Sequence, residues 1–130
     1  MAIQRCWNPL LATCPSRTSL AKIANKWTAL IVIALGERRL RFGELLDDVG
    51  GISKKVLTDT LRDLERDGIV ARTDHGGVPR RVDYELTPLG RTLERPLAVL
   101  VDWAAEHFDA VLQARADYDE RGSTGPGSPQ

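Results

Sequence analysis

The sequence contains few cysteines and histidines and no recognisable catalytic set. Cys6 and Cys14 are its only cysteines, and His75 and His107 are its only histidines, among 130 residues. These four residues are scattered along the chain and match no metal-ligand spacing, so neither a metal site nor a cofactor is expected. A structural disulfide is not expected in a reducing cytosol. No nucleophile paired with a base and no phosphate-binding loop is found, so we expect no enzymatic activity.

The sequence also lacks a long hydrophobic run. The longest apolar segment, from Ala29 to Leu35, is a buried-helix segment and falls far short of the roughly 18 residues of a membrane span. The first eight residues have neither the apolar region nor the cleavage site of a signal peptide. We therefore expect a cytoplasmic protein with no membrane partner. With 42% hydrophobic and 28% charged residues, the chain is suited to one globular domain with a single core.

A net charge is missing as well, because 18 Lys and Arg residues balance 18 Asp and Glu residues. The balance differs between the two ends of the chain. Residues 1–86 carry 14 basic and 11 acidic residues, whereas residues 87–130 carry 4 and 7. DNA binding requires a local basic surface rather than a basic protein. The zero net charge therefore leaves nucleic acid open as a partner without supporting it.

Helical periodicity predicts several helices in the first half of the chain. Apolar residues recur at helical spacing over residues 16–35, 42–49 and 53–67. Ser16 and Ser53 are predicted N-caps, and a break near Asn25 is expected to divide the first segment into two helices. A short strand is expected at residues 38–41.

A β-hairpin is predicted after the helix of residues 53–67. Strands at residues 69–73 and 81–86 flank a loop that contains Gly76, Gly77 and Pro79. Thr87 and Pro88 then begin another helix. The order helix, strand, loop, strand is that of a winged helix-turn-helix, in which one helix enters a DNA groove. The predicted fold class is mainly α with a small β-hairpin (α+β).

The C-terminal helix has more apolar surface than a small core can cover, and Pro96 is expected to kink or break it. Its apolar stripe consists of Leu97, Leu100, Ala104, Phe108 and Val111. A surplus apolar face is usually buried against a partner, so a homodimer joined by this long dimerisation helix is expected. The expected organisation is an N-terminal arm at 1–15, a winged helix-turn-helix domain with terminal dimerisation helices at 16–118, and a flexible tail at 119–130.

Two regions carry groups suited to DNA. When its apolar residues turn to the core, the helix of residues 53–67 presents Ser53, Lys54, Lys55, Thr58, Asp59 and Arg62 on its other side. Such side chains contact phosphates or base edges. Arg80 and Arg81, beside a loop of small residues, suit a minor groove. The sequence therefore predicts a DNA-binding protein, and the alternative is a winged-helix protein-interaction module that does not bind DNA.

A series of motifs then points to a family. They are Cys14-Pro15, Lys26-Trp27-Thr28, and residues 41–45, 51–58, 61–70 and 81–90. From about Cys14 to Phe108, the chain resembles the HxlR-type transcriptional regulators, relatives of the MarR group. The resemblance implies a homodimeric transcriptional regulator that binds double-stranded DNA at a pseudo-palindromic operator. The chain departs from the family pattern at Thr60 and Arg80, so an operator sequence cannot be transferred.

Cys14 is the candidate redox-sensing residue. It lies just before a predicted helix start, where free backbone N–H groups favour a thiolate. In several regulators that the chain resembles, the matching cysteine is the sensor, which implies a repressor that responds to oxidants or electrophiles. A buried structural thiol is the alternative for Cys14. A non-covalent small-molecule effector is the alternative for the signal.

Overall fold

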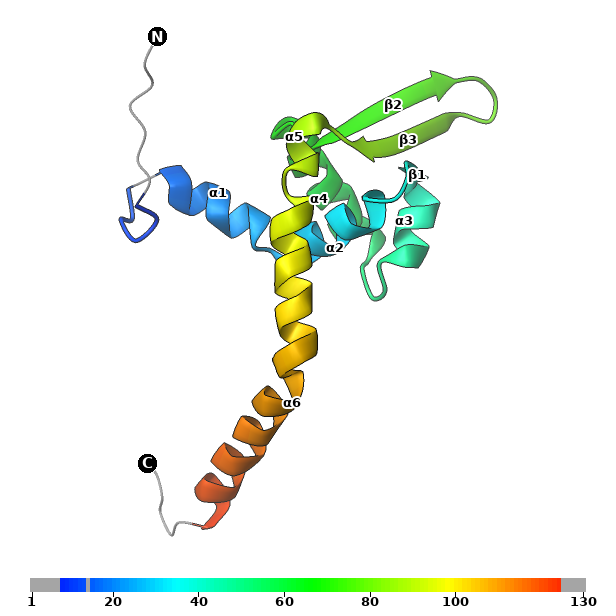
Figure 1. The fold of residues 1–130 in the computed structure, drawn as a ribbon. Helices are drawn as coiled ribbons and strands as arrows, with labels where there is room; N and C mark the ends of the chain where they lie inside the picture. Colours follow the sequence, from blue (N-terminus) through cyan, green and yellow to red (C-terminus); the bar gives the residue numbers. More distant parts are fainter. Residues whose placement is uncertain (1–7, 14, 125–130) are drawn as a thin grey trace. The chain divides into compact units, whose positions relative to one another are not determined.

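The computed structural model describes residues 8–13 and 15–124. The chain divides between Glu94 and Arg95 into two compact units. The first unit contains α1 (Pro15–Ile23), α2 (Lys26–Leu35), β1 (Leu40–Arg41), α3 (Phe42–Asp48), α4 (Lys54–Arg66), β2 (Val70–Gly76), β3 (Arg81–Leu86) and α5 (Pro88–Arg91) (Figure 1). The long helix α6 (Glu94–Thr124) starts at the boundary and makes up the described part of the second unit.

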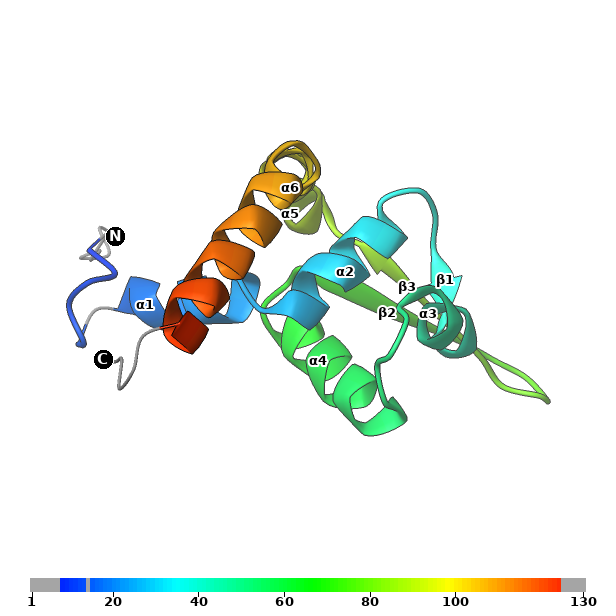
Figure 2. The ribbon, with the colours of Figure 1, turned by 90° about the horizontal axis from the view of Figure 1, so that it is seen from below.

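The strands form one antiparallel sheet in the order β1-β3-β2. In the hairpin, Val70 pairs with Leu86 and Arg72 pairs with Tyr84. Since alternate residues of a strand point to opposite faces, these four side chains share one face of the sheet. The loop end of the hairpin extends beyond the helices of the first unit in both views (Figures 1 and 2). The predicted mainly helical winged fold is confirmed, and β1 adds a third strand to the hairpin.

Helices α2, α3 and α4 enclose the core of the first unit together with the sheet. Helix α2 is apolar nearly all round, and Ile31, Val32 and Leu35 are fully buried. Each such side chain stabilises the fold by about 1.5–3 kcal/mol. The other buried apolar residues of this unit are Leu40, Leu45, Val49, Ile52, Leu57, Leu61, Leu64, Ile69, Val70 and Leu86. This core fixes the orientation of α4 relative to the hairpin.

Side chains at the helix starts explain where three helices begin. Asn25 accepts a hydrogen bond from the Trp27 N–H at 2.8 Å, so the predicted break between α1 and α2 is confirmed. Ser53 caps α4 by accepting from the Val56 N–H at 3.1 Å. Thr87 caps α5, with Pro88 as its first residue, as predicted. At the other end of α4, Gly68 has a φ of 78°, which glycine adopts without strain.

Some boundaries differ from the sequence prediction. Helix α1 begins at Pro15, so Ser16 lies inside its first turn and is not the N-cap. Strand β2 continues past residue 73 to Gly76, because its pairing with β3 extends that far. The C-terminal helix is interrupted between α5 and α6, and Pro96 is the third residue of α6. The expected break is therefore found within one turn before Pro96, and in the first turn of α6 the missing N–H of this proline has no intrahelical partner to lose.

Helix α6 has 31 residues, which corresponds to a length of about 46 Å at 1.5 Å per residue. It continues to Thr124, past residue 119, where the tail was expected to begin. The reason lies in composition, because residues 113–121 favour helix and the first proline after them is Pro126. Gln113 also donates a hydrogen bond to Asp117 at 3.0 Å along this stretch.

Among the described residues, no single helix is both long and apolar enough to cross a membrane. The adjacent α1 and α2 reach the required length and composition only together, and they are bent by 61° at the break between them.

Candidate nucleic-acid interface

Helix α4 presents the predicted DNA-binding residues from its N-terminus onwards. Lys54 and Lys55 form its exposed first turn, directly after the cap. The Lys55 ammonium lies 3.0 Å from the Asp59 carboxylate one turn later, and both side chains are largely exposed. Within the described parts of the chain, neither Lys54 nor Arg62 has an ion-pair partner. The structure therefore leaves these two cations of the predicted DNA-binding set free for an external anion.

The two predicted arginines of the hairpin both contact carboxylates of the same hairpin. The Arg80 Nε lies 2.9 Å from Asp74 Oδ2, and the Arg81 Nε lies 3.6 Å from Asp83 Oδ1. The Gly76 N–H donates to Asp74 at 2.8 Å. This hydrogen bond is the main cause of a lowered pKa of Asp74, which partial burial opposes and Arg80 supports. The wing thus carries arginines that are already balanced by anions.

Asp83 is the buried centre of a polar cluster at the base of the wing. Its carboxylate lies 2.9 Å from His75 Nε2 and 3.8 Å from Arg39 Nη1, besides the contact with Arg81. Only 4% of Asp83 is exposed. Burial, the largest effect, raises its pKa, but the hydrogen bond from His75 and the charges of Arg81 and Arg39 together lower it below its ordinary value. His75 is therefore a residue of β2 with a partner, although the sequence predicted that this strand ends at residue 73.

A polar hollow of about 390 Å³ lies between α4 and the hairpin. Its lining residues are Thr58, Leu61, Arg62, Glu65, Arg72 and Tyr84. Thr58 and Arg62 belong to the predicted DNA-binding set. Arg72 was not predicted as a site residue, although its position in β2 opposite Tyr84 follows from the alternation of the hairpin.

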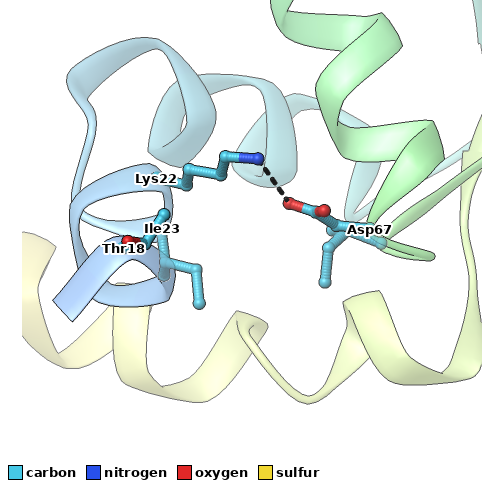
Figure 3. A pocket seen from close by; sticks show the side chains of 5 residues that line it. Thr18, Lys22, Ile23 and Asp67 are labelled. Atoms are coloured by element: carbon cyan, nitrogen blue, oxygen red, sulfur yellow. Dashed lines mark ion pairs between the residues drawn. The ribbon is translucent and has the colours of Figure 1, made fainter. Parts of the chain in front are cut away.

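A second pocket, of about 290 Å³, lies between α1 and the C-terminal end of α4 (Figure 3). The Lys22 ammonium of α1 lies 3.7 Å from the Asp67 carboxylate, which follows α4. Thr18, Ile23 and Ile69 complete the lining. This pocket combines an apolar surface with one cation and one anion.

The remaining predicted residues lie elsewhere. Cys14, the sensor candidate, and Cys6 lie outside the described residues. Of the α6 stripe, Leu100 is 63% and Phe108 is 51% exposed, whereas Leu97 is buried. Ala104 is exposed and Val111 is half-buried. Trp103, outside the stripe, stacks on His107 with ring centroids 4.9 Å apart.

Comparison with known proteins agrees with this architecture. Residues 22–111 match the family described as HxlR-like helix-turn-helix. The HTH-type transcriptional regulator YtfH of Escherichia coli (strain K12) is 41% identical over 108 residues, which cover 83% of each chain. The structure of the transcriptional regulator ytfH from Salmonella typhimurium has 38% identity and a TM-score of 0.78, and the match covers 84% of this chain and 97% of that one.

A redox regulator is also among the similar structures. The redox regulator HypR in its reduced form is 33% identical, with a TM-score of 0.70 over 76% of this chain and 98% of its own. The family match over residues 22–111 includes α4 and the hairpin that form the interface described above. On this basis, the chain belongs to the HxlR-like helix-turn-helix family of transcriptional regulators.

Proposed function

We propose that this protein is a homodimeric, cytoplasmic repressor that binds a pseudo-palindromic DNA operator through α4 and the β2–β3 hairpin. The observation that carries the proposal is the exposed face of α4, where Lys54 and Arg62 are cations without a partner in the described chain, beside a projecting hairpin that bears Arg80 and Arg81. In a winged helix-turn-helix, such a helix enters the major groove. Two copies related by a two-fold axis place their helices about 34 Å apart, one turn of DNA.

A protein-interaction module without DNA binding is the second candidate. The observation that favours it is the internal pairing of Lys55, Arg80 and Arg81 with carboxylates, which reduces the free positive charge. A titration of labelled duplex from the intergenic region upstream of the gene distinguishes the two. We expect binding whose affinity falls steeply with salt, because phosphate contacts release counterions. If neither this duplex nor an unrelated one binds at low salt, the protein-interaction module is supported instead.

For the signal, we propose that Cys14 is a redox sensor. Cys14 directly precedes α1 in the sequence, and α1 is joined to the end of α4 by the Lys22–Asp67 ion pair. HypR, the redox regulator with a similar structure, has been solved in both a reduced and an oxidised form. A change at the start of α1 can reach the recognition helix through this contact. The pocket beside the ion pair is the candidate site for a non-covalent effector in the alternative mechanism.

The sensor is tested by treating the wild type and a Cys14→Ser variant with diamide and measuring affinity for the upstream duplex. We expect treatment to change the affinity of the wild type and of a Cys6→Ser control, while Cys14→Ser no longer responds, because a thiolate is the group that is oxidised. A wild type that ignores diamide, or a Cys14→Ser variant that responds like the wild type, contradicts redox sensing through Cys14.

A further inference from the structure

The polar hollow between α4 and the hairpin lies where these two elements diverge. On α4, Thr58, Arg62 and Glu65 are spaced three and four residues apart, so they line one flank of the helix above the buried Leu61. From the sheet, Arg72 enters the hollow on the same face that carries Val70 into the core. The hollow is therefore the continuation of the core packing between helix and sheet, with polar side chains replacing apolar ones.

With the exception of Lys54, the predicted DNA-binding cations outside this hollow are paired with carboxylates. Lys55, Arg80 and Arg81 each have a carboxylate within 4 Å. Arg62 and Arg72 have no ion-pair partner in residues 8–13 or 15–124, although both line the same space. Two guanidinium groups that line one space, each without a carboxylate of the described chain within 4 Å, are suited to a tetrahedral oxyanion, which arginine holds through paired N–H donors.

The other lining groups fit the same ligand. Thr58 and Tyr84 are half-buried at the edge of the hollow and each has a hydroxyl that can donate a hydrogen bond. The volume of about 390 Å³ exceeds the roughly 30 Å³ share of one water molecule more than tenfold, so a phosphate group fits. Glu65 is the one lining group that repels an anion, and it makes binding weaker than the two arginines alone would allow.

We infer that this hollow is a binding site for a phosphodiester of the DNA backbone, clamped by Arg62 from α4 and Arg72 from β2. The inference rests on the proposed DNA-binding function and adds Arg72 to its residues. It also assigns Arg62 to a phosphate, whereas the sequence left a phosphate contact and a base contact open for this residue. A backbone clamp positions α4 in the groove and contributes no sequence preference of its own.

The test compares Arg62→Ala, Arg72→Ala, the double variant and a Glu65→Gln variant by fluorescence anisotropy. Each is titrated with the upstream duplex and with an unrelated duplex of equal length, over a series of KCl concentrations. Arg66→Ala is the matched control, because it removes the same charge from the same helix outside the hollow. Thermal unfolding of each variant checks that the fold is retained.

We expect Arg62→Ala and Arg72→Ala each to weaken binding about 10-fold on both duplexes. The plot of log affinity against log [KCl] should become less steep by about one for each phosphate that the variant no longer neutralises. Because both arginines hold one phosphate, the double variant should weaken binding by less than the product of the two single effects. Glu65→Gln should bind more tightly than the wild type, and Arg66→Ala should bind as the wild type does.

The outcomes separate this inference from the proposed function. A wild type that binds neither duplex refutes the DNA-binding function itself. A wild type that binds DNA, with Arg72→Ala indistinguishable from Arg66→Ala, overturns the clamp alone. The clamp is also overturned if Arg62→Ala loses the preference for the upstream duplex while the slope of log affinity against log [KCl] stays unchanged. That pattern identifies a base contact.

Discussion

At the scale of single residues, Asp83 shows how a buried charge fixes the base of the wing. A carboxylate that is only 4% exposed requires partners, and His75, Arg81 and Arg39 supply them from three positions around it. The three partners come from β2, β3 and the segment before β1. Removing Asp83 should therefore loosen the connection between the hairpin and the helical part of the first unit.

The lowered pKa of Asp83 gives a prediction with a defined sign. A carboxyl whose pKa is lower in the folded than in the unfolded state stabilises the fold at any pH above its ordinary pKa of 3.8. This stabilisation is lost as the pH falls below 3.8 and through the lowered pKa of the folded state. We expect Asp83→Asn to lower the melting temperature at neutral pH and to approach the wild type in strongly acidic buffer. Asp47→Asn, an exposed control in α3, should follow the wild type at every pH. A gap between wild type and Asp83→Asn that stays constant with pH would contradict this assignment.

At the scale of elements, the short helix α5 depends on close contact with the two residues that precede β2. Thr87 donates from its hydroxyl to the Gly68 carbonyl, and the Thr87 N–H donates to the Ile69 carbonyl at 3.0 Å. Gly90 is buried directly against that same carbonyl, and a Cβ there would collide with the Ile69 oxygen. Because the obstacle is backbone, it cannot rotate away.

We therefore predict that Gly90→Ala lowers the free energy of unfolding by about 1–3 kcal/mol or more, as overpacking of a tight contact does. Urea denaturation measures the change. Gly43→Ala in α3 is the matched control, since a Cβ at Gly43 meets nothing within 4 Å. The control should be neutral or more stable than the wild type, by up to about 1 kcal/mol, through the higher helix propensity of alanine. If both variants have the same free energy of unfolding, α5 can shift away from Ile69 without destabilising the fold, which contradicts the prediction.

Most elements were predictable from the sequence because local chemistry specifies them. Asn25, Ser53 and Thr87 act as caps through their own side chains, and the apolar spacing of α2 and α4 sets which side is buried. Features that depend on tertiary pairing were missed. His75 resembles a loop residue beside Gly76 and Gly77, and only its pairing with Asp83 shows it to be part of the wing.

The candidate site was likewise predictable only in part. The exposed residues of α4 follow from helical periodicity, which identifies the face opposite the core. The hollow does not, because Arg62 and Arg72 come from different elements and share a space only after α4 packs on the hairpin. The internal ion pairs of Arg80 and Arg81 were likewise invisible without the register of the strands.

At the scale of the whole molecule, the exposed stripe of α6 predicts the assembly. At 100° per residue, Leu100, Ala104, Phe108 and Val111 lie on one side of the helix, and Val99 lies on the opposite side. We expect the protein to sediment as a dimer at micromolar concentration and Phe108→Glu to shift it to monomer, because a charge would be buried in an apolar contact. Val99→Glu makes a similar change at a residue that is 60% exposed, and this control should remain dimeric. A monomeric wild type, or a Phe108→Glu dimer, would exclude the stripe as the dimer contact.

The carboxylates beside Lys55, Arg80 and Arg81 have a consequence for the molecule in a crowded cell. RNA and non-cognate DNA offer a large excess of negatively charged polymer, and a protein with many unmatched cations is retained on it by charge alone. Here each of these three side chains already has an anion of the same chain as its neighbour, and the whole chain is neutral. A phosphate of the polymer must displace this carboxylate before it can contact the cation, so brief nonspecific binding is only weakly favourable. Such a protein would be unbound much of the time. It would bind stably only to a duplex whose shape lets several of these cations exchange their carboxylates for phosphates at once.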